Sequence, residues 1–190
     1  MLTTTRLPKQ LSRLRDTDLL VTEKHIVGAF ALFDKEGHDV SDIVDRLQLD
    51  VVTEVFCGES TNSLTSNRQS FRTAMEKLQK IACVRQLLGR VGVLLDDKYI
   101  APQAVRFVDQ YQNSMADKAF SRTGDTTASS VCLIDDLIRK GKKREDIKNA
   151  VTSTLLAGKD PTATSLAFAI YEIARRPDVF AKMKTEVEQW

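Results

Sequence analysis

The sequence predicts a mainly α protein, organised as a single helical domain over residues 1–190. Apolar residues recur at intervals of three and four along most of the chain, which is the pattern of helices with one buried face. Glycine, proline and groups of Asp, Ser and Thr fall between these stretches, where helices begin and end. No stretch alternates convincingly between apolar and polar residues as a strand does, and no segment repeats. We expect roughly two-thirds of the residues to be helical, about twice the usual fraction.

Three helices are predicted in the first half of the chain. The first begins near Asp16, whose side chain can accept N-terminal N–H groups, as can those of the next two residues, and it ends before the turn at residues 34–39. The second begins near Val40 and ends at Cys57 and Gly58. The third follows the polar loop 59–67 and continues toward Leu88. The expected inner faces are Leu19, Ile26, Phe30 and Phe33 in the first helix, Val40, Ile43, Val44, Leu47, Val51 and Val55 in the second, and Phe71, Met75, Leu78 and Ala82 in the third.

Four more helices are predicted in the second half. Residues 91–102 give no clear pattern, and Pro102 suits the first turn of a fourth helix. A short helix over 131–140 ends at Gly141, and a long helix runs from about Arg144 to Arg175. Pro177 begins the last helix. The expected inner faces are Val105, Val108, Tyr111 and Met115 in the fourth helix, and Val179, Phe180, Met183, Val187 and Trp190 in the last.

Composition and charge exclude several classes of function. A net charge of +2 gives no basic field for nucleic acid, and no apolar run approaches the ~18 residues of a membrane span. The two histidines, His25 and His38, both lie near the N-terminus, so we expect no histidine-built metal centre. Cys57, Cys83 and Cys132 are widely spaced, which suits buried thiols in a reducing compartment rather than disulfides.

Four residues, Gly158 to Pro161, interrupt the long predicted helix. Pro161 cannot donate a hydrogen bond to the carbonyl of Ala157, which costs ~3 kcal/mol in a helix interior, and Gly158 adds roughly 1 kcal/mol relative to Ala. One interpretation is a boundary between two helices, with Asp160 as the N-cap and Pro161 in the first turn. The other is a single helix opened on one side, with carbonyls exposed beside a groove of small residues that a ligand can approach.

The run from Ala157 to Thr162, A-G-K-D-P-T, resembles the A-G-x-D/E-T-T/S motif of the haem-thiolate monooxygenases, the cytochrome P-450 superfamily. In that family the motif lies at the centre of the long I helix, which crosses the oxygen-binding face of the haem. Residues 45–64, 104–120 and 171–190 also resemble segments of that family, the first two those of its fungal alkane- and fatty-acid-hydroxylating members. The resemblance extends from about Arg13 to Trp190. It therefore implies the central part of a cytochrome P-450 domain, from about helix C/D to helix J, which is incomplete without the haem-cysteine loop and the N-terminal part.

The resemblance also implies roles for the motif residues. Asp160 would be the acid linked to solvent and, with Thr162, a candidate catalytic residue. Ala157, Gly158 and Pro161 would form the groove on the oxygen and haem face, with Gly158 letting the backbone lie close to bound oxygen. The family's usual alcohol directly follows the acid, but Pro161 has no hydroxyl. Thr162 lies roughly 100° further around the helix, so a water or the substrate's own hydroxyl would stand in for that alcohol.

Parts of the family pattern are missing. The chain has no F-x-x-G-x-R-x-C-x-G loop, so we expect no haem-ligating cysteine in it and three small, buried thiols instead. The propionate-binding W-x-x-x-R element is absent, since the only tryptophan is Trp190. Glu172 and Arg175 spell E-x-x-R outside its place in the family, and we expect a surface ion pair. The basic run 139–146 is expected to be a solvated turn rather than a reductase-docking surface.

By resemblance, the complete protein would be a haem-dependent monooxygenase that hydroxylates an apolar substrate such as a fatty acid or an alkane. It would take electrons from an NADPH-dependent cytochrome reductase on the cytoplasmic face of the endoplasmic reticulum membrane. We expect the present chain alone to bind no haem and to be inactive. The alternatives are a non-catalytic truncated product, or a helical scaffold or interaction protein that binds no haem.

Overall fold

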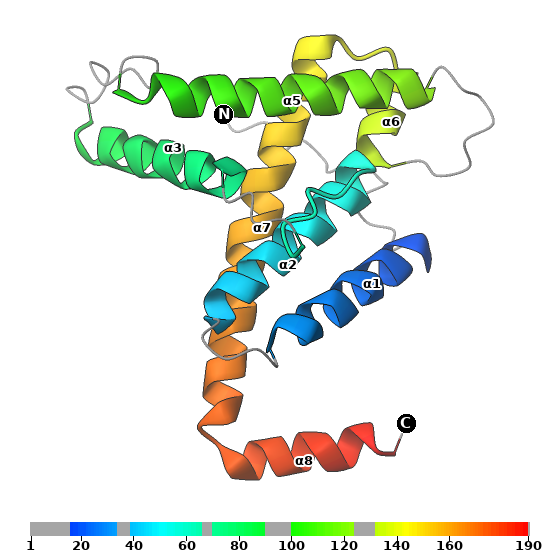
Figure 1. Ribbon diagram of the computed structural model, residues 1–190, viewed down its shortest axis with the longest axis vertical. Coiled ribbons are helices and arrows are strands. Elements are labelled where there is room, and N and C mark those ends of the chain that lie inside the picture. The colour runs from blue at the N-terminus through cyan, green and yellow to red at the C-terminus, as the bar shows by residue number, and fades with distance from the viewer. Residues whose placement is uncertain (1–15, 34–38, 66–69, 90–99, 124–131, 190) are drawn as a thin grey trace, which may run out of the picture.

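The computed structural model describes residues 16–33, 39–65, 70–89, 100–123 and 132–189, and every regular element in these ranges is a helix (Figure 1). The mainly α prediction is confirmed. The helices are α1 (Asp16–Phe33), α2 (Val40–Cys57), α3 (Ser70–Leu87), α5 (Pro102–Thr123), α6 (Leu133–Arg139), α7 (Arg144–Ala174) and α8 (Pro177–Val187). The side chains of Asp16, Thr17 and Phe71, residues 91–99 and Trp190 lie outside the described part of the chain.

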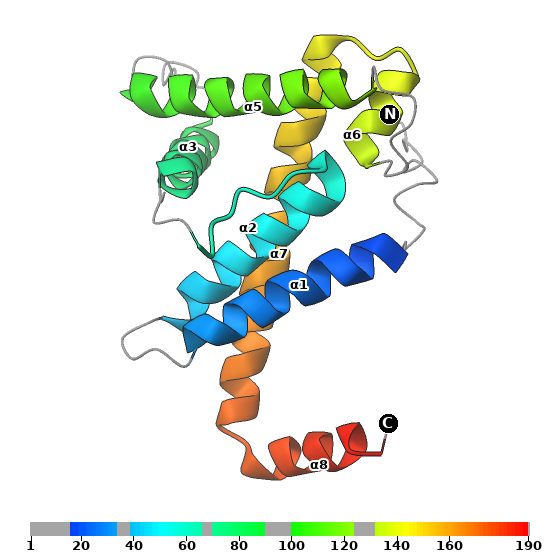
Figure 2. The ribbon, with the colours of Figure 1, turned by 45° about the vertical axis from the view of Figure 1, so that its right-hand side comes forward.

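The longest helix, α7, extends along the molecule, and the other elements are arranged around it (Figures 1 and 2). Helix α2 packs along α7, and α1 lies on α2. Helix α5 crosses the upper end of α7, with α3 and α6 packed against it. Helix α8 turns away at the lower end of α7 and touches little else in both views. The result is a broad upper part and a thin lower part.

Two groups of buried apolar side chains hold these helices together. The larger lies where α2, α3, α5, α6 and α7 meet, and it includes Val52, Val108, Ile134, Ile147 and Val151. The smaller lies between α1, α2 and the loop after α2, and it consists of Ala29, Ile43, Leu47 and Leu64.

The C-terminal end of α2 is fixed by a half-buried arginine. Gly58 ends the helix at φ 79°, a left-handed conformation that favours glycine. Arg122 of α5 donates to the Cys57 carbonyl at 2.7 Å and to Asp135 of α6 at 2.9 Å. A Cβ on Gly58 would lie only 2.8 Å from the Arg122 Nη2 atom. The glycine is therefore needed for both the backbone conformation and the space.

A buried carboxylate orders the loop that follows α2. Asp50 accepts the backbone N–H of Ser63 at 2.7 Å and that of Leu64 at 2.9 Å, and the hydroxyl of Thr61 donates to it at 2.6 Å. Because all three bonds go to one carboxylate on α2, the loop is held against that helix and places Leu64 in the smaller core.

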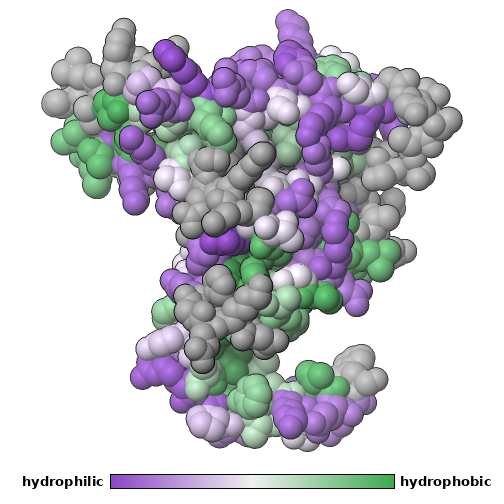
Figure 3. All heavy atoms as spheres, viewed as in Figure 1, coloured by the Kyte–Doolittle hydropathy of each residue, from purple (hydrophilic) through white to green (hydrophobic). Residues whose placement is uncertain are grey.

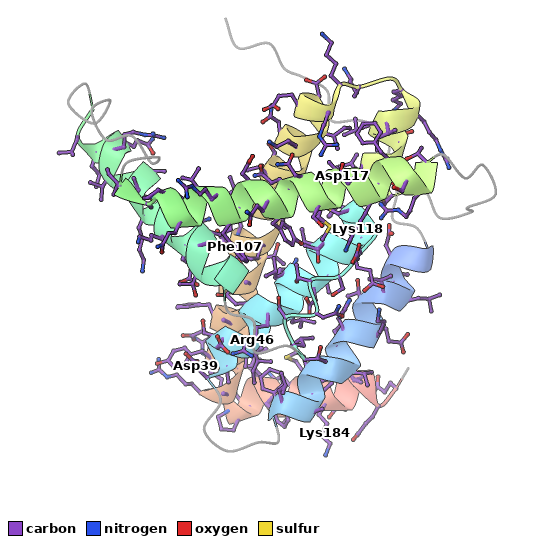
Figure 4. All side chains as sticks on the ribbon, turned by 45° about the horizontal axis from the view of Figure 1, so that its top comes forward. Asp39, Arg46, Phe107, Asp117, Lys118 and Lys184 are labelled. Atoms are coloured by element: carbon purple, nitrogen blue, oxygen red, sulfur yellow. The ribbon has the colours of Figure 1, made fainter. Side chains whose placement is uncertain are left out.

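Charged side chains tie α5 to its neighbours from two sides, as Figure 4 shows for Asp117 and Lys118. Asp117 pairs with Arg144 at the start of α7, and Lys118 pairs with Glu59 after α2. Arg144 lies in the basic run 139–146, whose described side chains are exposed from Arg139 onward. The expectation of a solvated turn for this run is therefore confirmed.

The predicted inner face of α1 is wrong. Leu19 and Phe30 are 53% and 63% exposed, whereas the buried residues are His25 and Ala29. His25 Nε2 lies 2.6 Å from the Glu54 carboxylate of α2, and the small Ala29 allows close approach. The helix therefore turns its small and polar side, rather than its most apolar side, toward α2.

Further burial predictions are also wrong: Val40, an expected inner residue of α2, is 37% exposed, and Ala82, an expected inner residue of α3, is exposed as well. None of the described residues of α8 is buried, and Phe180, Met183 and Val187 are exposed because no described element covers that face. Cys83 is exposed, because α3 turns Met75 and Leu78 toward the larger core and Cys83 away from it.

Candidate active site on α7

The long helix is continuous through the predicted interruption. Helix α7 runs from Arg144 to Ala174 with Pro161 inside it, so the prediction of a single helix is confirmed and the two-helix interpretation is wrong. Pro161 has no N–H, and the carbonyl of Ala157 therefore lacks its usual helical donor. Ala157 is itself exposed, so this gap in the hydrogen-bond pattern lies on the outer side of α7 rather than in the core.

One side of α7 around the proline is exposed and carries mostly small side chains. Ala157, Pro161, Thr164 and Phe168 are all exposed and follow one another at helical spacing, and we call these four residues the strip. Figure 3 shows apolar side chains on α8 and over the part of the molecule just above it. Because Ala157 and Pro161 have no long side chain, a flat apolar group can approach the backbone closely at this point.

Gly158 serves a different contact from the one predicted. A Cβ at this position would lie 3.1 and 3.3 Å from the two methyl carbons of Val52 on α2. The carbonyl of Gly158 also accepts a hydrogen bond from Gln48 Nε2 of α2 at 3.1 Å. The close approach that this glycine permits is therefore to α2, and not to a ligand on the strip.

Asp160 borders the strip, about 60° around the helix from Ala157. Its Oδ1 atom lies 2.5 Å from the ammonium of Lys159, and its Oδ2 atom accepts a hydrogen bond from Gln79 of α3. The side chain of Asp160 is 36% exposed, so it is in contact with solvent as well as with these partners. An acid in this position can exchange protons between solvent and the exposed side of α7.

Lys159 is the residue that the sequence interpretation overlooked. It is buried beside α2, and its ammonium lies 3.8 Å from Asp45 of that helix as well as close to Asp160. A signal was present, because Lys159 continues a run of buried residues spaced by four, after Val151 and Leu155 and before Ala163. A lysine in such a run indicates a paired buried charge.

Thr162, the other predicted catalytic residue, is exposed and lies about 100° around the helix from Pro161. The structure therefore groups Ala157, Pro161 and Asp160 on or beside the strip, and it places Gly158 and Thr162 to one side of it.

The described cysteines do not offer an axial ligand for a haem on this strip. Cys57 and Cys132 are buried in the core below α5, and burial raises the pKa of both thiols, that of Cys57 to about 12. Cys83 is exposed but lies on α3 rather than on α7. None of these three thiols lies on α7, the helix that carries the strip.

Three further observations concern the described part of the chain. Glu172 lies 4.0 Å from Arg175 and 3.3 Å from Arg176, so the predicted surface ion pair is confirmed and gains a second arginine. Among the described residues, no group of three or more His, Cys, Asp and Glu side chains could hold a metal ion. None of the described helices is long and apolar enough to cross a membrane.

Comparison with known proteins gives consistent matches over most of the chain. A family model described as Cytochrome P450 matches residues 24–190. Cytochrome P450 52C1 of Candida tropicalis is 33% identical over 139 residues, which cover 70% of this chain and 27% of that protein. Cytochrome P450 52A7 of the same organism is 27% identical over 164 residues, covering 79% of this chain and 32% of that protein. Cytochrome P450 monooxygenase fsdH of Fusarium heterosporum is 26% identical over 192 residues, covering 90% and 34%. The chain thus spans about a third of the length of these curated relatives.

Proposed function

The chain belongs to the cytochrome P450 family, and from this premise we propose that it is the central part of a monooxygenase that hydroxylates an apolar substrate. The class of substrate that we propose is fatty-acid-like or alkane-like. The resemblance of residues 45–64 and 104–120 to the fungal alkane- and fatty-acid-hydroxylating members supports this choice, as do the exposed apolar side chains of α7, Leu156, Leu166 and Phe168. Electrons would come from an NADPH-dependent reductase, and the complete protein would work at the cytoplasmic face of the endoplasmic reticulum membrane.

One observation carries the proposal: an uninterrupted α7 with Pro161 inside it, a small-residue strip at Ala157 and Pro161, and a carboxylate at its border. When bound, a haem supplies the oxygen and electron-transfer chemistry, with a thiolate ligand that favours cleavage of the O–O bond. Ala157 and Pro161 would lie against its oxygen-binding side, and the carbonyl of Ala157, which lacks a helical donor, would accept a hydrogen bond from a water there. Asp160 would pass protons between that water and solvent.

The proposed role of Thr162 is secondary. Its hydroxyl is turned away from the centre of the strip, so it can help only by ordering a water beside Asp160. We therefore assign proton delivery to Asp160 together with a bound water or the substrate's own hydroxyl, since Pro161 has no hydroxyl to offer.

The experiment uses the complete enzyme that contains this chain, produced with its reductase and supplied with a medium-chain fatty acid or alkane. NADPH-dependent formation of a hydroxylated product is expected, and Asp160→Asn should slow turnover by a factor on the order of 10–100 if it acts in proton transfer. Thr162→Ala is the matched control and should change turnover little. Loss of coupling in Thr162→Ala with Asp160→Asn nearly neutral would move the proton route to the threonine.

A second candidate function is a helical interaction protein that binds no haem. The observation in its favour is the exposed apolar side of α1, where Leu20, Val27 and Phe30 are 65%, 64% and 63% exposed. Assay of the complete coding region separates the two candidates, because only the monooxygenase requires NADPH and oxygen to act on a lipophilic molecule.

A further inference from the structure

A buried ammonium group lies between two carboxylates at the contact of α2 and α7. Lys159 is only 7% exposed, and an isolated charge at that depth would cost several kcal/mol. Its Nζ atom lies 2.5 Å from Asp160 Oδ1 and 3.8 Å from Asp45 Oδ1. The first contact has hydrogen-bond length and the second does not. The ammonium of Lys159 is therefore hydrogen-bonded to Asp160, and a small rotation of its side chain would bring it to Asp45.

The contact with Lys159 affects how Asp160 can act. Both oxygens of Asp160 have partners from the chain, Lys159 on Oδ1 and Gln79 on Oδ2. A water on the strip has to compete with that ammonium for Oδ1, so the contact with Lys159 restrains proton exchange at this oxygen. The lysine must in turn keep a negative partner when it leaves, because it is buried. Asp45, whose Oδ1 atom lies 3.8 Å from the ammonium, supplies that partner.

We propose that Lys159 is a positioning residue that moves between Asp160 and Asp45 and thereby holds or frees the acid beside the strip. In the structure the ammonium is on Asp160, so the acid is held. Transfer to Asp45 frees Asp160 Oδ1 while the lysine stays paired. The importance of the switch for catalysis rests on the proposed function, but the switch itself does not.

The geometry favours a movement of the lysine rather than of the helices. Gly158 is packed against Val52 and its carbonyl is bonded to Gln48, so the backbones of α2 and α7 are fixed next to Lys159. The lysine side chain has four rotatable bonds, and its ammonium can satisfy either carboxylate from the same backbone position. Two arrangements of similar contacts are therefore available without a change in the fold.

The switch can be tested on the chain itself by a triple-mutant cycle in urea unfolding. The coupling between Lys159 and Asp45 is measured with Lys159→Met and Asp45→Asn, first with Asp160 present and then with Asp160→Asn. If Asp160 and Asp45 compete for the same ammonium, Asp160→Asn should strengthen the coupling between Lys159 and Asp45. The expected increase is at least about threefold, expressed as a factor in the unfolding equilibrium constant. A coupling that is unchanged or smaller in the Asp160→Asn background would overturn the proposal.

A second measurement does not depend on Lys159→Met being folded. The ¹⁵N resonance of Lys159 Nζ is compared in the native chain, Asp45→Asn and Asp160→Asn, which all keep the lysine. The resonance is expected to move markedly with Asp160→Asn, as the ammonium transfers to Asp45, and little with Asp45→Asn. No change with Asp160→Asn would refute the switch.

In the complete enzyme, Asp45→Asn should lower the product formed per NADPH by about two- to tenfold, with the substrate KM unchanged, because Lys159 can no longer leave Asp160. Asp45→Glu keeps the second acceptor and should restore most of the product formed per NADPH. An unchanged yield of product per NADPH in Asp45→Asn would refute the catalytic importance of the switch. If Asp160→Asn is itself without effect on turnover, the proposed role of the acid fails, whereas the ion-pair cycle in the isolated chain is unaffected.

Discussion

The contact between Gly158 and Val52 gives a sharp prediction, because the two consequences of adding a methyl group at Gly158 oppose each other. In a helix interior, Ala is favoured over Gly by roughly 1 kcal/mol. Against this, the new Cβ would lie 3.1 and 3.3 Å from the methyl carbons of Val52, which is 2% exposed. Such distances are shorter than ordinary van der Waals contact, and crowding of this kind in a packed core costs about 1–3 kcal/mol.

We therefore expect Gly158→Ala to lower the free energy of unfolding by about 0–2 kcal/mol, the difference between these two effects. Shortening the neighbour should reverse the sign. In Val52→Ala both methyl carbons are gone, and the remaining Cβ lies 3.9 Å from the new atom, an ordinary contact. In that background Gly158→Ala should be stabilising by about 1 kcal/mol.

The measurement is urea unfolding of the four chains of this double-mutant cycle, followed by circular dichroism. Gly28 of α1 supplies the matched control, because it is also inside a helix and, among the described residues, a Cβ there would meet only Leu64 Cδ1 at 3.7 Å. Gly28→Ala should stabilise the native chain by about 1 kcal/mol. If Gly158→Ala stabilises the native chain as much as Gly28→Ala does, the close packing of α7 on α2 is not what requires the glycine.

Three other predictions concern groups away from this contact. The chain alone, given haem, dithionite and carbon monoxide, should show no absorption band of a thiolate-ligated haem; such a band would mean that one of its three cysteines is a ligand. Cys83 should react with a thiol reagent in the folded chain, whereas Cys57, whose pKa is raised to about 12 chiefly by burial, should react only on unfolding, as mass spectrometry of the labelled chain can show. Burial would raise the pKa of Glu54, but hydrogen bonds from Lys24 and His25 outweigh it and lower the pKa, so its contribution to stability should be present above about pH 4.5 and lost as the pH falls below that value. The difference in urea midpoint between the native chain and Glu54→Gln should accordingly shrink on acidification, and a constant difference would contradict this assignment.

Helix boundaries could be predicted from the sequence because they depend on local chemistry. Gly58 and Gly141 adopt the left-handed conformation that ends a helix, and Pro102 and Pro177 stand at helix starts. The buried side of α1 could not be predicted in the same way. Helical spacing says which residues share a side, but the neighbour decides which side is buried. Here the neighbour presents Glu54, 29 positions along the chain from His25.

The same distinction applies to the candidate site. The motif at Ala157 to Thr162 is local, and the sequence was enough to single it out. The partners that determine how Asp160 behaves are not local, since Gln79 lies 81 positions earlier and Asp45 comes from α2. The sequence also could not show that Gly158 faces α2, because a glycine in a motif gives no indication of which neighbour needs the space.

A proline inside a continuous helix requires a reason, because it removes a hydrogen bond and costs about 3 kcal/mol. The reason lies in where the proline occurs. The turn just before it is held against α2, through Val52 against Gly158 and Gln48 on the Gly158 carbonyl. Val151 and Leu155 before the proline and Ala163 after it are buried, so separating the two halves of α7 would expose apolar surface on both sides. The helix therefore stays straight enough to pack, while the missing bond falls on the exposed side, at Ala157. The fold in this way places a carbonyl without a helical donor beside the strip, which is the arrangement that the proposed water-dependent proton step beside Asp160 requires.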